Sequence, residues 1–151
     1  MGIVIAVTSG KGGTGKTSVT GGVASCLARL GKRVLCIDMD IGLRNLDISL
    51  GLSDRALMDF SDVAAGRCPL APAAVTHPAL PHLSLLTAPT SLSPDVTATR
   101  LRALPRTARD PYDHPMIASP APLGSGSHSV VHGPDLPPVA ATHAPPLPPP
   151  P

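Results

Sequence analysis

The sequence of 151 residues has no tryptophan, one tyrosine and one phenylalanine, and all ten of its acidic residues are aspartate. With so few aromatic rings, a folded core must be filled mainly by aliphatic side chains. Proline is absent before Pro69, whereas all 20 prolines fall within residues 69–151. This break in composition predicts a globular first part, followed by chain that is mostly linker or disordered.

Other absences exclude whole classes of function. The net charge of +2 comes without a basic stripe interleaved with aromatic residues, which argues against nucleic-acid binding. Cys26, Cys36 and Cys68 form no C-x-x-C pair, so we expect buried free thiols rather than a disulfide framework or a metal site. Because the sequence also has no signal peptide and no apolar run of transmembrane length, we expect a soluble cytoplasmic protein.

The clearest positive signal is a glycine-rich segment, G-K-G-G-T-G-K-T at residues 10–17, that follows an apolar run at 3–7. The β-branched run predicts a strand buried on both faces of a parallel sheet. Glycines lack the Cβ atoms that keep a backbone from wrapping a phosphate, and the first N–H groups of the following helix supply donors. The segment therefore fits the phosphate-binding loop G-x-x-x-x-G-K-[ST].

This loop assigns a role to each of its residues. Lys16 is expected to reach the β- and γ-phosphates of a nucleotide, and the Thr17 hydroxyl is expected to hold Mg²⁺. The cofactors implied are ATP, or its product ADP, and Mg²⁺. The residues expected to bind the nucleotide are Gly10, Lys11, Gly12, Gly13, Thr14, Gly15, Lys16, Thr17 and Ser18.

A helix and a second strand are expected after the loop. Apolar residues at helical spacing predict a helix with one apolar face, closed by Gly31 as a C-cap; these residues are Val19, Val23, Cys26, Leu27 and Leu30. With the apolar run at 34–37, the pattern is a right-handed strand–helix–strand unit. Both strands then end at one edge of the sheet, where Asp38 and Asp40 should face a ligand held by the loop.

The rest of the chain gives weaker signals. Residues 112–120 have the position of a strand, although Pro115 would remove a hydrogen-bond donor from a central strand. Residues 127–151 show no periodicity and end in polyproline, so no fold is assigned to them. The other expected elements are a short helix within 42–51, a helix over 56–65 ending at Gly66, a helical turn within 69–81, a strand at 83–86 and a helix at 96–104 that stops before Pro105.

Two segments resemble a known family. Lys11 adds a second lysine to the phosphate loop, and residues 37–47 read I-D-M-D-I-G-L-R-N-L-D. In order and spacing, both are similar to the MinD/ParA family of deviant Walker A ATPases, and within it to the septum-site-determining branch. The resemblance implies an α/β fold, a P-loop NTPase-like parallel sheet with flanking helices, here incomplete. It makes residues 1–126 a partial domain, closely matched over 1–89 and degenerate over 90–126, with 127–151 as a disordered proline-rich tail.

The resemblance also implies residue roles. Lys11 would reach across an ATP-dependent homodimer to the phosphates held by a second copy, and Asp40 would position the attacking water; with Lys16 these are the expected catalytic residues. Thr17 and Asp38 are expected at the Mg²⁺ ion. The implied function is an ATPase of the cell-division site-positioning type, with MinC- and MinE-like partners if that function is retained. A switch region that senses the γ-phosphate would contain Arg44 and Asp47.

The chain departs from this family near residue 118. The family has an aspartate that holds Mg²⁺ through water where this sequence has Ala118, and Pro122 stands where glycine is expected. We therefore expect ATP hydrolysis to be weak or absent. The family's later strands and its basic amphipathic terminal helix are not found, so we expect no ATP-dependent binding to anionic vesicles. The shift in composition is typical of a changed reading frame in GC-rich DNA or of a damaged gene copy, and it predicts a truncated or frameshifted protein.

Three other interpretations remain open. A partition ATPase of the ParA type would share the same loop. An iron–sulfur reductase of the same group would need paired cysteines later in the chain than Cys26, Cys36 and Cys68, which disfavours it. A non-catalytic interaction protein could use residues 134–151 as a polyproline ligand, although no basic residue flanks that run.

Overall fold

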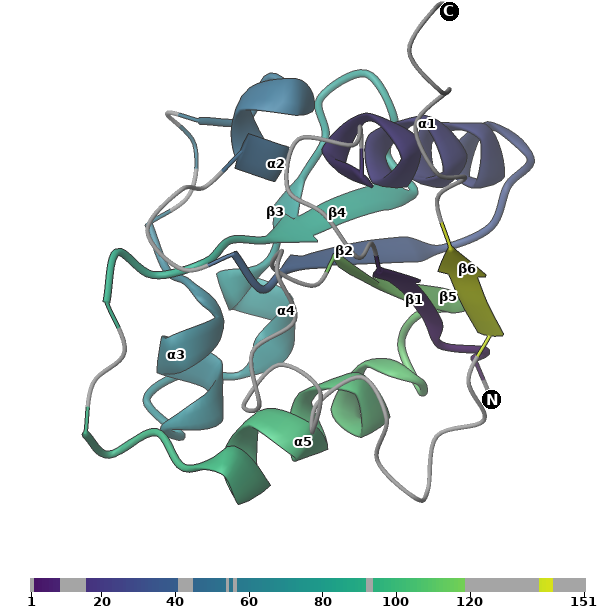
Figure 1. The fold of residues 1–151 in the computed structure, drawn as a ribbon. Coiled ribbons are helices and arrows are strands. Elements are labelled where there is room, and N and C mark those ends of the chain that lie inside the picture. Colours follow the sequence, from purple (N-terminus) through teal and green to yellow (C-terminus); the bar gives the residue numbers. More distant parts are fainter. Residues whose placement is uncertain are drawn as a thin grey trace, which may run out of the picture.

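One six-stranded sheet forms the centre of the molecule (Figure 1). The structure is a computed structural model that describes residues 2–8, 16–40, 45–53, 55, 57–91, 94–118 and 139–142. The strands lie in the order β3-β4-β2-β5-β1-β6, and every neighbouring pair is parallel except β3 with β4. Their bounds are β1 Ile5–Thr8, β2 Val34–Asp38, β3 Val75–Thr76, β4 Leu83–Leu86, β5 His114–Ala118 and β6 Val139–Thr142.

Helices cover both faces of this sheet, as Figure 1 shows. Helices α1 (Lys16–Arg29) and α2 (Asn45–Ser49) lie on one face. Helices α3 (Phe60–Ala64), α4 (Leu70–Ala73) and α5 (Ala98–Ala108) lie on the other. Alternate strand residues feed two separate cores, because side chains along a strand point to opposite faces. In β2, Val34 and Cys36 pack under α1 and α2, whereas Leu35 and Ile37 pack toward α3 and α5.

The predicted α/β architecture is confirmed, with strands at both apolar runs, 34–37 and 83–86. The short helix within 42–51 and the helical turn within 69–81 are also present as α2 and α4. The helix expected over 56–65 begins only at Phe60, because Asp59 caps it. The Asp59 carboxylate accepts hydrogen bonds from the backbone N–H groups of Ser61 and Asp62, and the Asp62 side chain accepts one from the N–H of Asp59.

The predicted helix is present as α1, but of its apolar face only Leu27 packs against the core, where it is half-buried. Val19, Val23 and Leu30 are 38%, 42% and 75% exposed, and the thiol of Cys26 is exposed as well. The face that α1 turns to the sheet consists of small residues, including Thr20, Ala24 and Ala28. Small side chains let the helix backbone approach the strands closely, and this close packing outweighs the apolar periodicity read from the sequence.

Two prolines lie inside regular elements, although the sequence predicted a helix that stops before Pro105 and counted Pro115 against a central strand at 112–120. Helix α5 does not stop before Pro105 but runs through it to Ala108, with Leu101, Leu104 and Ala108 buried against the sheet. The burial of this face outweighs the loss of one N–H donor. Pro115 is the second residue of β5, which lies between β2 and β1.

The place of Pro115 in the ladder explains why a central strand accepts it. Its register partner in β2 is Leu35, whereas the pairing of β5 with β1 begins one residue later, at Met116. The His114 N–H donates to the Arg33 carbonyl on the β2 side at 3.1 Å, so the Pro115 nitrogen faces β1 ahead of that ladder. The Ile3 N–H donates to the Asp113 carbonyl at 2.9 Å on this same side, so Pro115 removes one donor at the start of the pairing with β1 and leaves the ladder beyond it intact.

Strand β6 lies within residues 127–151, for which the sequence predicted no fold. Residues 139–142 pair in parallel with β1, from Ile5 opposite Val139 to Thr8 opposite Thr142. The expectation is therefore wrong for these four residues. The remainder of the predicted tail lies outside the described residues, and its disorder stays a prediction.

Gly2 anchors the start of the chain to the turn between α5 and β5. Its N–H donates to the Arg109 carbonyl at 2.8 Å, and its own carbonyl accepts from Arg109 Nε at 3.0 Å. A Cβ atom at this position would lie 2.1 Å from the Tyr112 carbonyl oxygen. Since that neighbour is backbone, only glycine fits here without moving the chain.

Candidate functional site

The carboxyl ends of three neighbouring strands meet at one edge of the sheet. In register, Ala118 at the end of β5 lies opposite Asp38 at the end of β2 and opposite Val7 in β1. Helix α1 begins at Lys16, after the glycine-rich segment that follows β1. In open α/β sheets, ligands bind outside the carboxyl ends of the strands, so this is the edge where a nucleotide site is expected.

Asp38 is the best-defined side chain at this edge. It is 3% exposed, and each of its carboxylate oxygens accepts one backbone hydrogen bond. Oδ1 accepts from the Asp40 N–H at 3.0 Å, and Oδ2 accepts from the Leu46 N–H, in the first turn of α2, at 3.3 Å. The carboxylate thus ties the end of β2 to the start of α2.

The surroundings of Asp38 disfavour the charged form of its carboxyl and raise its pKa. Burial raises the pKa of its carboxyl above the ordinary value, the backbone N–H groups of Asp40 and Leu46 lower it, and the nearby carboxylates of Asp40 and Asp47 raise it again. Burial is the largest of these effects. A cation beside this group would relieve both its desolvation and its repulsion by the other two carboxylates.

The other predicted residues divide into described and undescribed ones. Thr17 is half-buried in the first turn of α1, Ser18 is exposed, and Asp40 is half-buried. Asp47 is buried in α2, where its Oδ1 accepts from the Ile48 N–H at 2.9 Å. Outside the described residues lie Gly10, Lys11, Gly12, Gly13, Thr14, Gly15 and Arg44, together with the side chain of Lys16.

Two features of the edge were missed by sequence reasoning. The Leu46 N–H holds the second oxygen of Asp38, and a backbone donor eight positions away leaves no mark in a sequence. Gly21 lies where α2 crosses α1, because a Cβ there would be 3.4 Å from Ser49 Oγ and 3.5 Å from Leu50 Cδ2. Gly21 thus allows α2, which carries Asp47, to pack close to α1.

The donor set at this edge fits magnesium bound largely through a nucleotide. No group of three or more His, Cys or Asp side chains in the described part of the chain is arranged to hold a metal by itself. Mg²⁺ usually keeps several waters and takes only one or two protein carboxylates together with phosphate oxygens. Asp38 could supply one such carboxylate and Thr17 a hydroxyl in this mode of binding.

Comparison with known proteins decides the family. A model of the CobQ/CobB/MinD/ParA nucleotide binding domain (CbiA) matches residues 5–125. The chain belongs to this family. The resemblance inferred from Lys11 and residues 37–47 is therefore confirmed, and the fold is that of a MinD-type P-loop domain.

Named relatives point to one branch of the CobQ/CobB/MinD/ParA family. The septum site-determining protein MinD of Synechocystis sp. is 43% identical over 129 residues, which cover 85% of this chain and 48% of that protein. Among solved structures, MinD in the MinC:MinD complex of Aquifex aeolicus has a TM-score of 0.70 at 39% identity, covering 85% of this chain and 52% of that one. MinD from Pyrococcus horikoshii with Mg-ADP has a TM-score of 0.73 at 29% identity, covering 86% and 54%.

The chain spans about half the length of the curated relatives that it matches. The residues matched by the family model include the edge with Asp38 and the start of α1. No helix in the described ranges has the length and apolar character needed to cross a membrane.

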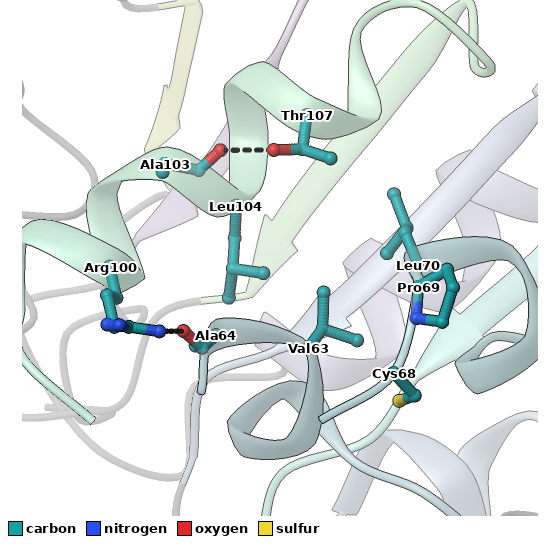
Figure 2. Close-up of a pocket in the computed structure, with 9 residues that line it drawn as sticks. All are labelled: Val63, Ala64, Cys68, Pro69, Leu70, Arg100, Ala103, Leu104 and Thr107. Carbon is teal, nitrogen blue, oxygen red and sulfur yellow. Dashed lines mark hydrogen bonds between the residues drawn. The ribbon is translucent and has the colours of Figure 1, made fainter. Parts of the chain in front are cut away.

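A cavity of about 260 Å³ lies away from this family site, on the opposite face of the sheet between α3, the α4 segment and α5 (Figure 2). Two polar side chains that line this cavity donate hydrogen bonds to backbone carbonyls of its own wall. Arg100 donates to the Ala64 carbonyl at 3.2 Å, and the Thr107 hydroxyl donates to the Ala103 carbonyl at 3.0 Å. It has no part in binding a nucleotide at the strand ends.

Proposed function

We propose that the chain binds Mg-ATP and Mg-ADP at residues 10–18 and belongs functionally with the septum-site ATPases, while hydrolysing ATP weakly or not at all. Three observations support this. The family match covers the loop, a similar MinD structure is titled as a complex with Mg-ADP, and Asp38 lies at the strand edge beside α1.

The proposed roles follow the chemistry of phosphoryl transfer, in which positioning and neutralisation of charge do most of the work. The loop backbone and Lys16 would hold the phosphates, and Thr17 and Asp38 would hold Mg²⁺ directly or through water. The ion, when bound, neutralises the charge that develops on the phosphate oxygens. Asp40 would orient the attacking water, and Lys11 would reach the phosphates of a second copy in a homodimer.

The position of Ala118 carries the proposal of weak hydrolysis. Ala118 pairs in register with Asp38, and both side chains lie on the α1 face of the sheet, because Ala118 packs in the core under α1. An aspartate here would place a second carboxylate beside the first, at the strand ends. A methyl group offers no ligand to a cation and no acceptor to its waters.

The nucleotide site is tested by equilibrium binding of a fluorescent ATP analogue with Mg²⁺. Lys16→Ala should weaken binding by about tenfold or more, since a hydrogen bond to a charged group contributes roughly 1.5–3 kcal/mol. Lys32→Ala, at the far end of α1, is the matched control and should bind as the original chain does. Equal affinity of the Lys16→Ala variant and the original chain would refute the site.

The proposal of weak hydrolysis is tested by introducing a carboxylate at position 118. Ala118→Asp should raise phosphate release by about tenfold or more, a change typical of residues that support a metal site, without strengthening binding of ATP measured without Mg²⁺. Rapid hydrolysis by the original chain, or no gain in the variant that still binds Mg-ATP, would contradict the role given to Ala118.

The cellular part of the proposal is positioning of the division site, with MinC- and MinE-like partners and ATP-dependent pairing through Lys11. It rests on identities of about 40% to septum site-determining proteins and on the MinC:MinD title of the Aquifex aeolicus structure. Sedimentation of the chain with a MinC from a matching relative, with Mg-ATP and with Mg-ADP, is the direct test. Absence of nucleotide-dependent association would remove this part and leave nucleotide binding intact.

A further inference from the structure

The cavity between α3, the α4 segment and α5 has an apolar floor and a rim open to solvent (Figure 2). Its lining residues Ala64, Leu70 and Leu104 are 7%, 7% and 3% exposed, whereas Ala103 and Thr107 on α5 are exposed. At about 260 Å³ the cavity is larger than the roughly 150 Å³ in which an engineered apolar site holds benzene. It therefore has room for an organic molecule of about six to ten non-hydrogen atoms.

Arg100 is the one charged residue among the nine described residues that line the cavity. A guanidinium group has five N–H donors, and one of those of Arg100, on Nη1, donates to the Ala64 carbonyl at 3.2 Å. Within the described ranges, no carboxylate pairs with Arg100. Its other N–H groups can therefore donate to an anionic acceptor at the rim, as charge-assisted hydrogen bonds.

The charges around the cavity differ between its two ends. Helix α5 contains three arginines, at positions 100, 102 and 106, and no acidic residue. On the α3 side, Asp62 and Asp95 both contact Arg67, at 3.0 and 2.8 Å. Burial, and after it the charge of Asp62, raises the pKa of the Cys68 thiol, so that end of the cavity disfavours negative charge. The acid group of a ligand is therefore expected beside Arg100 and its hydrocarbon part toward Cys68.

We propose that this cavity binds a small monocarboxylate, with its hydrocarbon chain against Leu70 and Leu104 and its carboxylate on the Arg100 guanidinium. Binding removes apolar surface of both the chain and the cavity floor from water. The Thr107 hydroxyl already donates to the Ala103 carbonyl at 3.0 Å, so it does not compete for the ligand as a donor. The site lies on the α5 face of the sheet, apart from the nucleotide site, and it does not depend on the proposed function.

Cys68 gives the proposal a direct readout, because it is half-buried and lines the cavity. Cys26 is exposed on α1, on the opposite face of the sheet, and serves as the internal reference. Cys36 is fully buried, and burial raises the pKa of its thiol to about 12, so it does not react with thiol reagents at neutral pH. The rate of alkylation at Cys68, divided by the rate at Cys26 and measured by peptide mass spectrometry, therefore reports cover of the cavity.

The experiment uses the full 151-residue chain, with hexanoate as the probe. Hexanoate should lower the alkylation ratio by about threefold or more, at concentrations on the order of 1–30 mM, as expected for a ligand of this size. Hexanamide has the same chain without the charge and should need about tenfold higher concentrations, because it lacks the charge-assisted hydrogen bond. Acetate has the charge without the chain and should leave the ratio unchanged at the same ionic strength.

Two substitutions separate the charge from the cavity. Arg100→Gln should weaken protection by hexanoate about tenfold and leave protection by hexanamide unchanged. Arg102→Gln is the matched control, because Arg102 is exposed on the same helix and does not line the cavity, and it should behave as the original chain does. Ala103→Leu adds a larger side chain at an exposed position of the rim, so it should abolish protection by both compounds while α5 stays helical.

Four results would overturn the proposal of a carboxylate site. The first is unchanged alkylation of Cys68 at about 30 mM hexanoate, which is the upper end of the range expected for such a ligand. The second is equal protection by hexanamide and hexanoate in the original chain. The third is equal protection by hexanoate in Arg100→Gln and the original chain. The fourth is slowing of Cys26 in parallel with Cys68, which would show non-specific binding.

Discussion

The helices on the two faces of the sheet pack against it with residues of different size. On the α5 face, large side chains point inward, with Leu101 and Leu104 buried and arginines outward. On the α1 face, Ala24 and Ala28 point inward and Val23 and Leu30 outward. Both helices are amphipathic in sequence, yet only α5 buries its larger apolar residues.

The difference between α1 and α5 separates two properties of a helix, namely which of its residues are apolar and which of them face the sheet. Apolar periodicity predicts a helix with an apolar face, but it does not say which of its residues face the sheet. The width of the gap between helix and sheet decides which residues fit beneath the helix, and α1 lies close enough that only small ones do. The larger apolar residues of α1 therefore lie on its outer face, although the same residues define its apolar periodicity.

The largest expected difference in the free energy of unfolding is between one leucine-to-alanine substitution on the α5 side of the sheet and one on the α1 side. Leu104→Ala should lower the free energy of unfolding by roughly 2–5 kcal/mol, because it opens a cavity in the α5 core. Leu30→Ala removes the same atoms from a side chain that is 75% exposed, and such surface changes stay within about 0.5 kcal/mol. Urea unfolding followed by circular dichroism measures both. Equal losses would mean that Leu30 is covered in solution.

A smaller effect is expected from enlarging adjacent residues of α1. Ala24 has no exposed surface, so Ala24→Leu should cost about 1–3 kcal/mol by overpacking the narrow gap beneath the helix. Val23→Leu, one residue away on the outer face, should change stability by less than about 0.5 kcal/mol. The same unfolding measurement applies. A harmless Ala24→Leu would show that the gap is wider than the burial of the small residues implies.

The smallest effect concerns charge at the two ends of the sheet. The folded pKa of Asp38 is raised by burial, so the folded state binds its proton more tightly, and stability should fall as pH rises through the range just above the ordinary aspartate pKa. Asp113 behaves oppositely. The Arg33 backbone N–H and guanidinium lower its pKa, so its contribution is lost as pH falls below the ordinary range.

Thermal melts from pH 3 to pH 7 distinguish the two carboxylates, and Asp38→Asn and Asp113→Asn should each remove one part of the profile. Asp38→Asn should flatten the decline above the ordinary aspartate pKa, and Asp113→Asn should flatten the loss in acid. Addition of Mg-ATP should reverse the decline in the original chain. A decline that persists in Asp38→Asn would assign the pH dependence to another group.

The sequence predicted most of what is local and little of what depends on distant neighbours. The strands at 34–37 and 83–86 were recognisable because apolar runs between turn residues need no tertiary information. The edge with Asp38 followed from the strand–helix–strand pattern and was refined by the family resemblance. The continuation of α5 through Pro105 was not predictable, since burial of its apolar face overrode the local cost of proline. The strand within 112–120 was expected in that position, although Pro115 counted against it. The loop residues 10–15 and Arg44 lie outside the described part, so their roles remain predictions.

The insertion of β1 between β5 and β6 has a consequence for how the chain is made. Ile5 pairs with Met116 on one side and Val139 on the other, and Gly2 is anchored by Arg109. The first strand to leave the ribosome therefore has no sheet neighbour until the last quarter of the chain follows it. At 5–20 residues per second, that delay is roughly 5–20 s, during which an apolar strand is exposed to chaperones and to other nascent chains. The rate of synthesis therefore sets how long β1 waits for the strands that pair with it.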